Sequence, residues 1–171
     1  DGLAAGLGSA VDIATSAALS VVNFLTGADG IELLAADLEK LGADSLLLGG
    51  TRTARSEGRH VNAASRGGRV GAGVALDRPE LLLVGGRIVV EGSPAAATRL
   101  VSSAAATPAE ARLLVEDDAA VLALSSRRLS LDRGTASLTG TSSLAVAGNA
   151  SLEAGGGLVL AGRYPIVVHQ L

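Results

Sequence analysis

The last third of the chain repeats short apolar pairs at close spacing. In each pair one residue separates the two apolar members, which is the alternation of a short β-strand with one buried face. Turn-forming residues, such as Asp132-Arg133-Gly134 and Gly148-Asn149, lie between the pairs. Three such strands occupy about 20 residues, a period that predicts a solenoid. The pairs are Leu129/Leu131, Ala136/Leu138, Leu144/Val146, Ala150/Leu152 and Leu158/Leu160.

The composition favours a narrow core of aliphatic side chains. The 171 residues contain no Trp, Met or Cys, and the aromatic residues are limited to Phe24 and Tyr164. A globular domain usually fills irregular interior space with several aromatic side chains, whereas stacked aliphatic rows do not need them. The 23 glycines fit many tight turns. We therefore expect an all-β solenoid.

Charge and cysteine content exclude several classes of function. The net charge of -3 argues against a nucleic-acid-binding protein. The absence of cysteine excludes disulfides, thiolate metal sites and a cysteine nucleophile. The longest uncharged run, residues 13–28, is diluted by Ser, Thr and Asn and falls short of the about 20 apolar residues of a spanning helix. We expect no membrane insertion.

The first half of the sequence mixes expected strands with one helical turn. Residues 20–25 predict a strand, although a helix over 12–25 stays open because alanine is the best helix former. Residues 37–41 predict one helical turn closed by Gly42. Further strands are expected at 45–48, 74–76, 81–84, 87–90 and 121–124.

Residues 51–73 form an Arg-rich excursion from this pattern, either a long loop or a hairpin on the surface. The segment holds a single acid, Glu57, and few apolar residues. Its arginines are candidates for binding an acidic partner, such as an anionic glycan or lipid. The candidate residues are Arg52, Arg55, Arg59, Arg66 and Arg69.

Residues 93–110 form a second excursion, rich in Ala and Ser. Thr107-Pro108-Ala109-Glu110 matches a capping box with proline at the first helical position. A short helix through Leu114 is therefore expected as readily as a strand over 112–115.

The run LEKLGADSLLLGGTR, from Leu38 to Arg52, resembles a region of the filamentous-haemagglutinin-like exoproteins of Gram-negative bacteria. That region has no assigned function in the family. The resemblance covers residues 31–55 and is only compositional elsewhere, and the family's secretion-signal domain is not recognisable here. It implies a right-handed parallel β-helix, export by a two-partner system, and a role in adhesion or surface structure.

The sequence contains no recognisable catalytic, cofactor-binding or metal motif. It has no Gly-x-Ser-x-Gly nucleophile elbow and no phosphate loop, and the glycine-dense residues 67–73 lack dinucleotide-binding spacing. His60 and His169 are far apart and have no cysteine to join them in a metal site. Glu116-Asp117-Asp118 has no calcium-loop spacing and reads as a solvated acidic turn. We expect no enzyme, no cofactor and no metal.

A carbohydrate-active enzyme on a β-helix is an alternative. Such enzymes need carboxylates that project from neighbouring rungs, with basic partners and aromatic side chains that stack on sugar rings. The aromatic side chains are missing. The candidate side chains are Asp77, Glu80, Glu91 and Asp132, with Arg78, Arg87 and Arg133.

These features predict a structural or adhesive segment of a secreted or cell-surface filamentous exoprotein of a Gram-negative bacterium. Residues 1–171 are interpreted as one right-handed parallel β-helix segment of a longer or processed chain, with one or two loop or short-helix excursions. The unpaired strand edges of a solenoid predict end-to-end self-association or continuation by a longer chain. A host or bacterial surface receptor is a further expected partner. A second alternative is a binding module that holds an acidic partner through the Arg-rich excursion.

Overall fold

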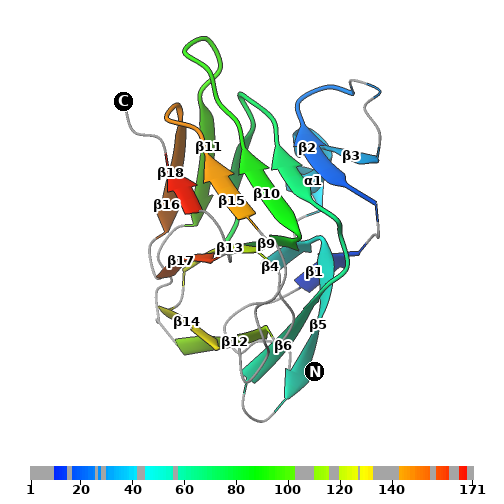
Figure 1. Ribbon diagram of the computed structural model, residues 1–171, viewed down its shortest axis with the longest axis vertical. Helices are drawn as coiled ribbons and strands as arrows, with labels where there is room; N and C mark the ends of the chain where they lie inside the picture. Colours follow the sequence, from blue (N-terminus) through cyan, green and yellow to red (C-terminus); the bar gives the residue numbers. More distant parts are fainter. Residues whose placement is uncertain are drawn as a thin grey trace.

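The protein is mostly β, with parallel sheets and one short helix. The computed structural model describes residues 10–14, 17–25, 27, 30–41, 45–55, 58–102, 110–115, 120–126, 128–132, 143–154, 157–161 and 166–168. Within them the strands form four sheets, which we name A to D (Figure 1). In the view of Figure 1, sheet B crosses the upper part of the molecule, sheet A the middle and sheet C the lower part.

Sheets A and B contain the longest stacks of strands. Sheet A has the spatial order β1 (Ala10–Ile13), β4 (Ser45–Leu48), β9 (Glu80–Gly85), β13 (Ala120–Ser125) and β17 (Gly157–Ala161). Sheet B has the order β18 (Ile166–Val168), β15 (Ser143–Val146), β10 (Arg87–Val90), β7 (Gly68–Val70), β2 (Leu19–Val22) and β3 (Ile31–Leu34).

Sheets C and D are smaller. Sheet C has the order β14 (Arg128–Asp132), β12 (Glu110–Val115), β6 (Gly58–Ala63) and β5 (Gly50–Arg55). Sheet D has the order β16 (Ala150–Ala154), β11 (Thr98–Ser102) and β8 (Ala75–Asp77). Helix α1 (Ala35–Lys40) contacts β3 and β8.

From β7 onward the chain passes through sheets B, D and A in a repeating order. β7, β8 and β9 make the first passage, β10, β11 and β13 the second, and β15, β16 and β17 the third, before β18 returns to sheet B. Every neighbouring pair in sheets B and D is parallel and in register. One line across sheet B contains Val21, Val70, Val90, Val146 and Val168.

The main core lies between sheets A, B and D. Leu76 and Leu100 are buried in register on sheet D, and Leu152 continues their row. Sheet A supplies Leu46, Leu48 and their register partners on β9 and β13. From α1, Ala35 and Leu38 join the same cluster, so this helix covers one end of the interior. The aliphatic core that the composition predicts is thus present in the described residues.

Sheet A is buried on both faces, which explains its unbroken apolar runs. Leu46 and Leu48 belong to the main core, and the intervening Leu47 is equally buried on the opposite face. There β5 and β14 of sheet C contact β1 and β17 of sheet A. Residues 46–48, 81–84 and 121–124 are therefore apolar throughout instead of alternating.

Strand β13 runs against the direction of its neighbours. It pairs antiparallel with both β9 and β17, while β1, β4 and β9 are mutually parallel. The chain enters β13 from β12 and leaves it to β14, both in sheet C. This detour reverses the strand, a feature that the apolar pattern does not predict.

Most predicted elements are present, and two alternatives are decided. The expected helical turn at 37–41 corresponds to α1, and the strand at 87–90 to β10. The helix considered for 12–25 is wrong, because β1 and β2 lie there. Residues 110–115 form β12, so the strand is confirmed and the short helix through Leu114 is wrong. The pair Ala136/Leu138 lies outside the described residues.

The two expected excursions differ in outcome. Residues 50–63 form the antiparallel hairpin β5–β6, but residues 68–70 already belong to sheet B, so the Arg-rich segment ends before residue 73. The Ala/Ser-rich segment contains strand β11 of sheet D. Two of the buried positions of β11, Thr98 and Ser102, are polar. The alternation of apolar residues therefore does not predict this strand.

Candidate functional site

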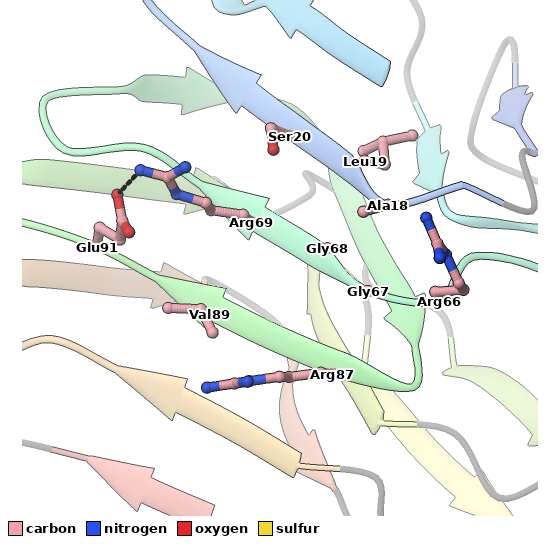
Figure 2. Close-up of a pocket in the computed structure, with 10 residues that line it drawn as sticks. All are labelled: Ala18, Leu19, Ser20, Arg66, Gly67, Gly68, Arg69, Arg87, Val89 and Glu91. Atoms are coloured by element: carbon pink, nitrogen blue, oxygen red, sulfur yellow. Dashed lines mark hydrogen bonds and ion pairs between the residues drawn. The ribbon is translucent and has the colours of Figure 1, made fainter. Parts of the chain in front are cut away.

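An open groove of about 560 Å³ lies on the face of sheet B that points away from the core. We call it the arginine groove. It crosses β2, β7 and β10, and Figure 2 shows its lining side chains. The lining residues are Ala18, Leu19, Ser20, Arg66, Gly67, Gly68, Arg69, Arg87, Val89 and Glu91.

Strand register places these residues together. Ser20, Arg69 and Val89 are in register on three adjacent strands, so they share the outer face. Gly67, just before β7, lies between the β2 residues and Arg87 in Figure 2 and has no side chain to fill the groove. A Cβ atom at Gly67 would lie 3.0 Å from the Arg87 carbonyl oxygen, so any side chain there would narrow the groove.

The groove carries an excess of positive charge. Its lining contains three arginines and one glutamate, on a chain whose net charge is -3. Arg69 Nη2 lies 2.8 Å from Glu91 Oε1, and this hydrogen bond raises the pKa of Arg69 above its ordinary value. The side chains of Arg66 and Arg87 are exposed and have no hydrogen-bond or ion-pair partner among the residues that the structure describes.

The arginines predicted for partner binding occupy different environments. Arg66 and Arg69 line the groove. The Arg52 side chain is only 9% exposed and lies between sheets, bonded to Asp12 and Ser45. Its guanidinium group is therefore part of the interior of the protein. Arg55 and Arg59 lie on β5 and β6, and the structure describes only their backbone.

Arg52 belongs to a buried polar cluster between sheets A and C. Arg52 Nη1 lies 3.5 Å from Glu80 Oε1, and Glu80 is fully buried. The hydroxyls of Ser45 and Ser125 donate to the Glu80 carboxylate at 2.6 and 3.1 Å. The pattern of apolar residues misses this cluster. Ser45 and Glu80 each precede a leucine run and are in register, and that is the signal that locates them.

The carboxylates considered for catalysis do not converge. Asp77 lies on sheet D, Glu80 on sheet A, Asp132 on sheet C, and Glu91 follows the sheet B strand β10. Glu80 is fully buried and cannot contact a polymer substrate. Arg78 forms an ion pair with Glu39 at 3.2 Å, and Arg133 lies outside the described residues. This arrangement offers binding contacts, with no pair of carboxylates placed across a substrate among the described side chains.

The described residues contain no group of three or more His, Asp and Glu side chains placed to hold a metal ion. His60 is buried on β6, whereas His169 and the run Glu116-Asp117-Asp118 lie outside the described residues. Within the described residues, no helix is long and apolar enough to cross a membrane.

Comparison with known proteins identifies no relative. No protein-family model, no curated protein and no solved structure matches this chain.

Proposed function

We propose that this chain is a segment of a right-handed parallel β-helix that serves as a structural or adhesive part of a secreted or cell-surface filamentous exoprotein of a Gram-negative bacterium. The observation that carries the proposal is the repeated passage through sheets B, D and A. Each passage adds one strand to each of the three sheets, and in sheets B and D the added strand is parallel to the strand before it and in register with it.

The energetics of stacking agree with this architecture. Burying one valine or leucine side chain contributes about 1.5–3 kcal/mol, and rows such as Val21, Val70 and Val90 repeat that gain at every rung. One rung has too little core to be stable alone and depends on its neighbours. Among crossover connections between parallel strands of one sheet, about 98% are right-handed, which supports the proposed handedness.

Both ends of the stack offer strand edges. Among the described residues, β1 and β17 each have one neighbour in sheet A, and β3 and β18 each have one in sheet B. Within each sheet the two edge strands run in the same direction. The β17/β18 end of one copy therefore extends both sheets when it is placed against the β1/β3 end of another.

The β1/β3 end also exposes apolar side chains. Phe24, the only phenylalanine of the chain, is 72% exposed, and Leu25 and Leu41 are 63% and 50% exposed. Leu25 and Leu41 line a mostly apolar groove of about 360 Å³ between β3 and α1, which also contains Glu32 and Asp37. Large exposed apolar side chains gathered at one place mark an interaction surface. A further set of rungs, from another copy or from a longer chain, is the occupant we propose.

Size measurement across protein concentrations, together with electron microscopy, tests the stacking. We expect filaments that lengthen with concentration, and a diffraction spacing of about 4.8 Å along their axis. Phe24→Asp with Leu41→Asp should prevent assembly, and Ala95→Asp, on an exposed turn, should not. A wild-type chain that stays monomeric at all concentrations would reject stacking between copies, and circular dichroism dominated by helix would reject the β-helix.

A further inference from the structure

The arginine groove contains the only unpaired arginines among the described side chains. Six arginines have described side chains, and Arg52, Arg69, Arg78 and Arg99 form ion pairs with acidic residues. The other two, Arg66 and Arg87, both line the groove. Two unpaired guanidinium groups at the same hollow present donors that a bound anion can use.

A second hollow of about 400 Å³ adjoins the arginine groove, and we call it the alanine groove. Both hollows are lined by Val89 and Glu91, so they form one continuous track over sheet B. The alanine groove is otherwise lined by small or apolar residues, which leave its floor smooth. They are Ala72, Val90, Gly92, Ala145 and Ala147.

We propose that this track binds an extended acidic polysaccharide, with Arg66 and Arg87 each binding the carboxylate of a different uronic acid unit. The guanidinium group is planar and matches a planar carboxylate with two parallel hydrogen bonds. An open track on a sheet face suits a polymer that continues past the site at both ends. The smooth alanine groove accommodates the C–H face of the next sugar.

Glu91 restricts the charge density of the ligand. Its carboxylate is paired with Arg69 and lies where the two hollows meet. A ligand with several anionic groups on each unit would place more like charge beside Glu91, which disfavours binding. The Ser20 hydroxyl offers a neutral partner for sugar hydroxyls in the same groove. A uronic acid polymer, which carries one carboxylate on each sugar, therefore fits better than a densely sulfated glycan.

Binding of short oligogalacturonates, measured by titration calorimetry at two salt concentrations, tests the proposal. We expect the wild-type chain to bind and higher salt to weaken the binding. Arg66→Ala with Arg87→Ala should lower the affinity at least about tenfold. The matched control Arg99→Ala removes an exposed arginine on sheet D and should leave the affinity unchanged. Equal thermal unfolding of all variants by circular dichroism shows that folding is preserved.

Three further ligands and one further variant test whether the site selects a carboxylate and requires the guanidinium group. Methyl-esterified oligogalacturonate, which lacks the charge, should not bind. Sulfated dextran oligomers and phosphatidylserine vesicles should bind more weakly than the carboxylated sugar, and tighter binding of either would overturn the assigned ligand. Arg66→Lys with Arg87→Lys should lose affinity despite its retained charge. Unchanged affinity in the alanine variant would overturn the site. The result does not depend on whether copies stack, because the track lies on the face of sheet B.

Discussion

The Ser45 hydroxyl donates a 2.6 Å hydrogen bond to the Glu80 carboxylate across two adjacent parallel strands of sheet A. Arg52, from hairpin β5–β6, donates to the same hydroxyl and lies 3.5 Å from Glu80. Asp12 of β1 accepts a hydrogen bond from the Arg52 backbone N–H at 3.0 Å. This cluster attaches sheet C to the outer face of sheet A through one buried cation.

Removal of the Arg52 guanidinium group should destabilise the fold strongly. Glu80 would then lose its ion pair with Arg52 while staying buried, and breaking a buried pair in this way costs about 3–5 kcal/mol. We expect Arg52→Ala to lower the free energy of unfolding by that amount in urea unfolding followed by circular dichroism.

Replacing both members of the pair separates this effect from lost packing. Arg52→Met with Glu80→Leu removes both charges of this pair and should cost less than Arg52→Ala alone. Arg99→Gln, at a pair whose side chains are 62% and 54% exposed, should leave the unfolding midpoint nearly unchanged. If Arg52→Ala were as mild as Arg99→Gln, the cluster would have no stabilising role.

Gly49 should tolerate no side chain. Its φ is +96°, and a Cβ atom would overlap the Val84 carbonyl oxygen of the adjacent strand. We expect Gly49→Ala to cost at least about 2 kcal/mol. Gly27, with φ of +76° and no atom within 4 Å of a built Cβ, is the matched control. Gly27→Ala should cost only about 1 kcal/mol, and equal losses in urea unfolding would contradict the steric argument.

The run that carries the family resemblance is explained by structural roles. Leu46, Leu47 and Leu48 are buried because sheet A is covered on both faces, and Gly49 makes the bend into the hairpin. Ser45 and Arg52 form the buried cluster. Residues 45–50 are all buried, so packing constrains this part of the run without any catalytic role.

Strand positions were more predictable from the sequence than strand partners. Residues 144–146, 150–152 and 158–160 alternate clearly and become β15, β16 and β17 of three different sheets. Local alternation shows that a strand has one buried face, but it does not show which strand lies beside it. The hairpin β5–β6, the reversed β13 and the pairing of Arg52 with Glu80 depend on contacts distant in sequence. The arginine groove likewise requires the register of β2, β7 and β10.

Substitution of Leu82 tests how tightly sheet C packs on sheet A. It is buried on the face of sheet A that sheet C covers, outside the main core. Leu82→Ala should destabilise by about 2–5 kcal/mol, because the two sheets cannot close the cavity. Val89→Ala, on the half-buried outer face of sheet B, should cost less than about 1 kcal/mol. Comparable losses for the two variants would show that sheet C does not pack tightly on sheet A.

Glu153 should titrate below the ordinary glutamate range. Arg99 Nε on β11 lies 3.0 Å from Glu153 Oε2 on β16, and this hydrogen bond, helped by the opposite charge, lowers the pKa of Glu153 below 4.5. Because the folded pKa lies below the unfolded one, the pair stabilises above the unfolded pKa, and its contribution disappears as pH falls through the folded pKa. Titration by carboxyl NMR should show the lowered pKa in the wild-type chain and its return toward 4.5 in Arg99→Gln. Since both side chains are exposed, added salt should also reduce the shift, and a pKa insensitive to both changes would refute the pair.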